Sequence, residues 1–112
     1  MRDEPDFGTI VKVPPPPKYF NKYAKREYKT VTARMLSLNL LNDVNIALVA
    51  AYAIEIGKYY EAEEKLSEVG RLDIAKDADG NILKISRLPL DKMASDYLAN
   101  AKALAVELGK LS

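Results

Sequence analysis

The sequence predicts a mainly α-helical fold, namely a helical oligomerising domain with a long central helix and one β-hairpin before the C-terminal helix. Three segments have apolar residues at helical spacing and no internal proline, and they span residues 19–38, 43–69 and 89–108. Between the last two segments lies a stretch that contains Asp79-Gly80, a pair typical of a tight hairpin turn. The middle segment is apolar over most of its circumference, which favours burial among other helices.

The length of 112 residues predicts one domain, and 48% apolar with 29% charged residues is typical of a folded protein. Residues 1–17 differ from the rest because they end in four consecutive prolines, Pro14 to Pro17. Such a run favours an extended conformation and cannot join a packed helix. We therefore expect a Pro-rich extended arm over 1–17, followed by a single helical domain over 18–112.

Several kinds of chemistry are excluded by composition. The chain has no Cys and no His, so disulfides, thiolate or Ser-His nucleophiles and the usual zinc sites are ruled out. The segment around Gly80 does not fit a calcium loop, because Ala75 and Ser86 would occupy two essential ligand positions. No phosphate-binding loop is present. We expect no enzymatic activity, no cofactor and no metal ion.

The sequence also predicts no association with a membrane. The longest uninterrupted apolar run, Ile46 to Ile54, is too short to cross a bilayer. The acidic start of the chain does not resemble a secretory signal. The expected location is the cytosol.

The first predicted helix, 19–38, has one apolar and one basic face. Phe20, Ala24, Val31, Met35 and Leu38 fall on one side at 100° per residue. The candidate DNA-binding residues fall nearly opposite or beside that face, and they are Lys18, Lys22, Lys25, Arg26 and Lys29. Between residues 12 and 34, seven basic residues stand against the single acid Glu27. A row of cations spaced about 5–6 Å apart suits a phosphate backbone, although a solvated face is the commoner explanation of a lysine run.

The second predicted helix runs from about Asp43 to Val69. Asn42 or Asp43 can cap its start, and Gly70 can end it. Its first half is apolar nearly all round, so one neighbouring helix cannot bury it. Either two more helices of the same chain or helices of other subunits could do so. With so few elements in the chain we favour other subunits, and we assign Leu48 and Ile54 to the oligomer interface.

The hairpin, 72–86, is predicted from its register. A two-residue type I′ turn at Asp79-Gly80 places Ile74 opposite Ile85 and Lys76 opposite Leu83. A three-residue loop would instead place Ile74 opposite Lys84. We favour the shorter turn because it pairs like with like, and we add Ile74 and Ile85 to the oligomer interface. The last helix then starts near Leu88-Pro89, where proline suits the first turn.

The order of these features resembles a known family, the small terminase subunits of tailed phages and prophages, in particular the P27-type group. The resemblance covers nearly the whole chain. It includes "PPPPKYF", Tyr28 in the middle of the first helix, "LNLLNDVNIALVAAYA", "YYEAEEKLSEVG", the hairpin ending at Leu88-Pro89 and "ASDYLANAKALAVELG". The sequence departs from the family in lacking the polar, Arg-containing tail that often follows the last helix.

The resemblance implies a non-catalytic subunit in the cytoplasm of the phage host. Such a subunit forms a homo-oligomeric ring, binds viral double-stranded DNA and presents it to the large terminase subunit, the motor that packages the genome. Two alternatives stay open on the residues alone. One is a helical oligomeric scaffold or regulatory protein that binds only protein. The other is a transcriptional regulator, although the second helix is too long for an ordinary helix-turn-helix.

Overall fold

The computed structural model describes residues 12–110. The predicted mainly α fold is confirmed, with three helices and one antiparallel hairpin before the last helix. The elements, in chain order, are α1 (Lys22–Ser37), α2 (Asp43–Val69), β1 (Leu72–Lys76), β2 (Ile82–Arg87) and α3 (Pro89–Gly109). The bounds of α2 match the prediction because both ends carry local signals. The Asn42 side chain accepts a hydrogen bond from the Asn45 amide, and Gly70 ends the helix at φ 84°.

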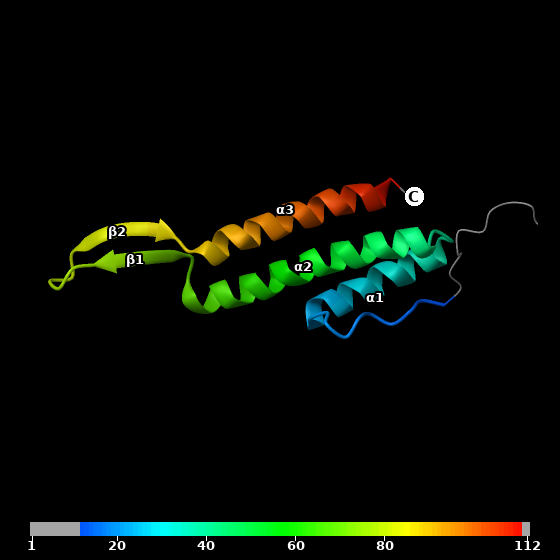
Figure 1. Ribbon diagram of the computed structural model, residues 1–112, viewed down its shortest axis with the longest axis horizontal. Coiled ribbons are helices and arrows are strands. Elements are labelled where there is room, and N and C mark those ends of the chain that lie inside the picture. The colour runs from blue at the N-terminus through cyan, green and yellow to red at the C-terminus, as the bar shows by residue number, and fades with distance from the viewer. Residues whose placement is uncertain (1–11, 111–112) are drawn as a thin grey trace, which may run out of the picture.

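The three helices lie side by side, with α2 in the middle, and the hairpin projects beyond one end of them (Figure 1). Helix α2 packs against α1 along one side and against α3 along the other. Two helices of the same chain therefore cover two sides of α2. This is one of the two arrangements that the sequence left open for burying its apolar surface. The broad faces of this layer are not covered by a further layer of the described chain.

The larger core lies between α1 and the first half of α2. It contains the buried residues Phe20, Ala24, Tyr28, Met35, Leu41, Val49 and Ala53. The predicted face of α1 is correct for Phe20, Ala24 and Met35, but Leu38 is exposed because the helix ends at Ser37. Tyr28 joins this core through its ring and donates a hydrogen bond from its hydroxyl to the Pro14 carbonyl at 2.9 Å.

The described part of the Pro-rich arm is extended and packs along α1. Val13 contacts the larger core, and Pro14 accepts the Tyr28 hydroxyl. Residues 1–11 of the predicted arm lie outside the described residues. The described part of the arm therefore contributes to the packing of the helical domain.

Helix α2 is in close contact with the start of α1 at Gly57. A Cβ atom at this position would lie 2.7 Å from the Ala24 Cβ and 2.7 Å from the Asn21 Oδ1. The Asn21 side chain also donates to the Gly57 carbonyl at 3.0 Å, so the contact fixes the start of α1. The absence of a side chain at Gly57 is therefore a condition for this packing.

We expect Gly57→Ala to lower the free energy of unfolding by about 1–3 kcal/mol, because overpacking at a rigid contact exceeds the gain in helix propensity. Gly109→Ala is the matched control, since a Cβ there meets nothing within 4 Å. Urea denaturation of both variants measures the difference. A Gly57→Ala variant as stable as the wild type would contradict the close packing.

A second, smaller core lies between the end of α2 and the start of α3. It contains Ala62, Leu66 and Ala94, with Tyr59, Leu88, Leu90 and Tyr97 packed against them. Leu66 is almost completely buried. Leu88, which follows β2, connects the end of the hairpin to this core.

The predicted type I′ turn is wrong, whereas the predicted pairing of Ile74 with Ile85 is correct. The Asp77 amide donates to the Asn81 carbonyl and the Gly80 amide to the Asp77 carbonyl, which defines a three-residue loop. Such a loop alone would bring Ile74 opposite Lys84. A bulge at Leu83 shifts the register by one residue, so that Lys76 pairs with Ile82 and Ile74 with Ile85.

Gly80 adopts φ 85°, the left-handed position that completes a three-residue hairpin loop. Apart from Gly80 and its two chain neighbours, no heavy atom of the described residues lies within 4 Å of the place that its Cβ would occupy, so a substitution there acts through the backbone alone. We expect Gly80→Val to destabilise the hairpin by about 1–2 kcal/mol, because a β-branched residue is disfavoured at positive φ. Hydrogen exchange of the β1 and β2 amides measures this change. Unchanged protection would rule out the strain.

Three charged residues attach the hairpin to the helices. Arg71 donates to Asp91 at 2.6 Å and also contacts Glu63, while Arg87 contacts Asp91 and donates to Ser95 at 2.8 Å. The Leu88 amide donates to the Arg71 carbonyl at 2.9 Å beside them. Asp91 thus joins both ends of the hairpin to the first turn of α3. We call Arg71, Arg87 and Asp91 the hairpin clamp.

The clamp gives the hairpin a pH dependence. The hydrogen bonds from Arg87 and then Arg71 hold the pKa of the Asp91 carboxyl below its usual value. A lowered pKa in the folded state means that this contribution is present above the unfolded-state pKa and is lost as pH falls through the folded value. We expect the stability difference between wild type and Asp91→Asn to shrink on acidification below about pH 4. Thermal unfolding from pH 7 to pH 2 measures it, and a difference independent of pH would contradict the clamp.

Candidate nucleic-acid interface

The basic side chains belong to α1 and the turn before it. Helix α1 begins at Lys22 because Asn21 caps it, with the Asn21 side chain accepting from the Ala24 amide at 2.8 Å. The prediction that the helix starts at residue 19 is therefore wrong by one turn. Lys18 lies in the preceding turn, outside the helix, and its side chain is exposed.

The structure brings most of the predicted residues to the outer surface of α1. Lys18, Lys22, Arg26 and Lys29 are exposed, whereas Lys25 is half-buried. The helical residues among them lie away from the ridge of Ala24, Tyr28 and Met35 that packs on α2. We call Lys18, Lys22, Lys25, Arg26 and Lys29 the basic row.

One member of the row is already partly neutralised. The Lys22 Nζ lies 3.9 Å from a carboxylate oxygen of Glu64 on α2, and both side chains are more than half exposed. A surface pair of this kind contributes about 0–1 kcal/mol, so Lys22 can exchange its partner for a phosphate. Within residues 12–110, Lys18, Lys25 and Lys29 make no ion pair.

Tyr23 contacts two members of the basic row, Lys22 and Arg26. The Lys22 Nζ lies 5.0 Å from the centre of its ring and the Arg26 guanidinium carbon 5.3 Å from it, within cation–π range. The Tyr23 hydroxyl contacts Glu64, and its ring packs on Tyr60. Tyr23 therefore anchors cations to α2, a role that the sequence did not reveal because Glu64 and Tyr60 are distant along the chain.

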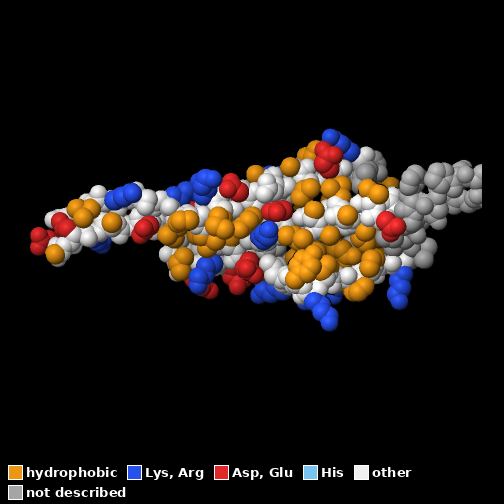
Figure 2. Space-filling view, viewed as in Figure 1, with side chains coloured by type: hydrophobic (Ala, Val, Ile, Leu, Met, Phe, Trp, Pro, Cys, Tyr) orange, Lys and Arg blue, Asp and Glu red, His pale blue; other side chains and the backbone are white. Residues whose placement is uncertain are grey.

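The residues predicted for an oligomer interface fall into two groups. Leu48 and Ile54 are half-buried, and Ile54 already packs against the larger core. Ile74 and Ile85 are exposed at 45% and 56%. The hairpin pair is therefore the freer of the two for contacts outside the chain. Figure 2 shows further hydrophobic side chains over one broad face of the helical layer.

The acidic side chains do not form a metal site in the described part of the chain, where no group of three potential ligands comes together. Among the same residues, no helix combines the length and apolarity needed to cross a bilayer.

A family model described as phage terminase, small subunit, matches residues 24–110, which include α1 from its third residue, α2, the hairpin and α3. Searches of curated proteins and of solved structures gave no match. The matched region covers most of the chain, and it contains the helical layer, the hairpin and most of the basic row. The chain therefore belongs to the phage terminase small subunit family, which acts in phage DNA packaging.

Proposed function

We propose that this chain is a non-catalytic subunit that assembles into a ring, binds viral double-stranded DNA through the basic row and presents it to the large terminase subunit in the host cytoplasm. The observation that carries the proposal is the position of the row. Exposed cations lie on α1 and just before it, outside the ridge that packs on α2, in a member of a DNA-packaging family. The lysines among them meet phosphates as point charges, and such contacts do not read bases.

Assembly is supported by what the chain leaves uncovered. The helices form a layer whose broad faces have no second layer, and the hairpin exposes five large aliphatic side chains. Packed domains normally need two layers around a core, and a lone two-stranded hairpin is marginal in water. A second copy of the chain would supply both missing contacts. We assign Leu48, Ile54, Ile74 and Ile85 to this interface.

Repetition of the row around a ring explains how weak contacts can give useful affinity. Each lysine contributes little at physiological salt, but copies held on one assembly act together on one DNA molecule. This repetition would also make binding depend on assembly. A dilute monomer should bind DNA much more weakly than the ring does.

Two measurements on the wild-type protein test the proposal. Light scattering at micromolar concentration should give the mass of a closed oligomer, and fluorescence anisotropy should give DNA binding whose affinity falls steeply with salt. A monomer at this concentration would overturn the ring. An oligomer without affinity for DNA would instead favour a scaffold that binds only protein.

A further inference from the structure

The hairpin has one apolar and one polar face, although both face solvent within the described chain. Cross-strand partners project from the same side of a sheet, so the pairs Leu72–Arg87, Ile74–Ile85 and Lys76–Ile82 share one face. Leu83 lies on this side too, two residues before Ile85. We call Leu72, Ile74, Ile82, Leu83 and Ile85 the hairpin face. The opposite side carries Asp73, Ala75, Lys84 and Ser86.

The five side chains of the hairpin face are between 45% and 67% exposed. The chain does not cover them itself, because the hairpin clamp directs both strands away from the helices (Figure 1). Two arginines on one aspartate hold this direction from both ends of the hairpin. A one-sided apolar element that is anchored at its base is suited to docking on a partner.

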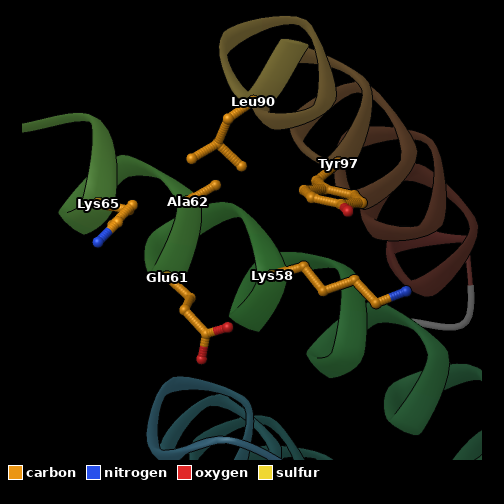
Figure 3. Close-up of a pocket in the computed structure, with 6 residues that line it drawn as sticks. All are labelled: Lys58, Glu61, Ala62, Lys65, Leu90 and Tyr97. Atoms are coloured by element: carbon orange, nitrogen blue, oxygen red, sulfur yellow. The ribbon is translucent and has the colours of Figure 1, made fainter. Parts of the chain in front are cut away.

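A hollow with apolar lining residues, to which the hairpin face could bind, lies on the helices. Figure 3 shows a hollow between α2 and α3, lined by Lys58, Glu61, Ala62, Lys65, Leu90 and Tyr97. Its volume is about 280 Å³, and Ala62, a member of the smaller core, is among the residues that line it. Apolar cavities of about 150 Å³ already accept a benzene-sized group, so aliphatic side chains fit here. We call it the α2–α3 hollow.

The composition of the hollow is typical of a protein-binding site. Ala62, Leu90 and Tyr97 supply apolar surface, while Lys58, Glu61 and Lys65 form a charged rim. Lys58 lies over the Tyr97 ring at 5.5 Å and pairs with Glu55 at 3.8 Å. Among the described residues, Lys65 pairs with the exposed Glu68 alone, at 3.9 Å. Both lysines keep exposed side chains that a partner can contact.

We infer that the hairpin face of one copy docks in the α2–α3 hollow of a second copy, an inference that rests on the proposed assembly. The charges of the two surfaces are complementary. Asp77 and Asp79 form the tip of the hairpin and meet a rim that contains Lys58 and Lys65, while Lys76, at the end of the apolar pairs, meets Glu61. The aliphatic side chains enter the hollow between these charged groups.

The contact joins two different surfaces, so each copy carries one hairpin to donate and one hollow to fill. Contacts of this type are heterologous and generate rings when the rotation closes. Cyclic symmetry also keeps hairpin and hollow at the same height along the ring axis. The long axis of each subunit therefore lies close to the plane of the ring, with the hairpin of one subunit overlapping the body of the next.

Disulfide trapping tests the contact, because the chain has no native cysteine. Leu83→Cys, carrying a mass tag, is mixed with untagged Lys65→Cys at micromolar concentration and oxidised mildly. The matched control replaces Lys65→Cys with Ser67→Cys, which is also exposed on α2 but lies about 160° around the helix from it. We expect the mixed disulfide with Lys65→Cys to form at least tenfold faster than with Ser67→Cys.

The outcomes separate this inference from the proposed function. Equal rates for the two pairs, or no mixed disulfide, in a sample that light scattering shows to be oligomeric would overturn the docking and leave the ring. A monomeric sample would overturn both. A double variant with Leu83→Cys and Lys65→Cys gives a second readout, since docking predicts a ladder of covalent multimers that ends at the subunit number of the ring.

Discussion

Replacing Ile74 with aspartate is expected to dissociate the assembly into folded monomers. Ile74 lies opposite Ile85 on the hairpin face, and both side chains are largely exposed within the chain. The substitution therefore removes no contact from either core. Between subunits, however, it would bury a carboxylate without a partner, at a cost of several kcal/mol per contact. Since each 1.4 kcal/mol changes an association constant tenfold, we expect assembly to weaken by at least 100-fold.

The neighbouring residue provides a matched control. Ala75 is also exposed, lies next to Ile74 on β1 and points to the polar face opposite Lys84. Ala75→Asp introduces the same charge at nearly the same place but on the other side of the sheet. Light scattering should give the wild-type mass for Ala75→Asp and a monomer for Ile74→Asp, with equal helix content by circular dichroism. Equal masses for the two variants would mean that the hairpin face is not buried between copies.

The other two interface candidates make poorer probes. Leu48 and Ile54 are half-buried, and Ile54 packs against the larger core of its own chain. A charge at either position would destabilise the fold as well as any contact between subunits. The loss of assembly in such a variant would therefore have two explanations. A variant of the hairpin face distinguishes the two explanations, because the chain itself leaves that face uncovered.

The parts of the fold that the sequence predicted best are those with local causes. Helix α2 has the predicted bounds because Asn42 caps its start and Gly70 ends it, and both signals lie within a few residues of the helix. Helix α1 was predicted one turn too long because Tyr19 and Phe20 continue its apolar pattern. Asn21 overrides that pattern, since its side chain caps α1 and also bonds to Gly57. The second bond depends on a residue far along the chain.

The hairpin shows how a correct pairing can rest on an incorrect turn. Pairing like with like gave Ile74 opposite Ile85, and this pairing is observed. The loop has three residues, and the bulge at Leu83 restores the register that the longer loop would have shifted. A bulge has no reliable signal in a single sequence, because it depends on which residues of the two strands come to face one another.

The sequence predicted which residues of the basic row share a surface, but it did not predict what those residues contact. The spacing of the lysines gave their common surface on α1, since that follows from helical geometry. The cation–π contacts of Tyr23 and the ion pair of Lys22 with Glu64 depend on how α1 packs on α2. For the same reason, the sequence did not indicate that Tyr28 holds the arm through Pro14.

The largest effect on DNA is expected from reversing two charges of the basic row. Lys18 and Lys29 are exposed, and neither makes an ion pair within the described residues. Lys18→Glu combined with Lys29→Glu therefore leaves the packing of α1 unchanged, whereas changing Lys22 would disturb its contacts with Glu64 and Tyr23. We expect the double variant to keep the wild-type oligomeric mass and to lose at least 100-fold in DNA affinity at 100 mM salt.

The control carries the same change of charge on another surface. Lys92→Glu combined with Lys102→Glu reverses two exposed lysines on α3, which packs on the opposite side of α2 from α1. A general loss of positive charge would weaken DNA binding equally in both double variants. Contact through the basic row predicts that only the α1 variant loses most of its affinity.

Salt dependence distinguishes contact from long-range attraction. Each neutralised phosphate contributes about 0.9 to the slope of log affinity against log salt, so removing contacts lowers the slope as well as the affinity. The α1 variant should therefore show a smaller slope than the wild type, and the α3 variant the wild-type slope. Sequence preference should survive where it arises from DNA bending against the assembly, since contacts of lysine with phosphate carry no sequence information. Wild-type affinity and slope in the α1 variant would place the DNA contacts elsewhere, with Lys12 of the arm and the two arginines of the hairpin clamp as the next residues to change.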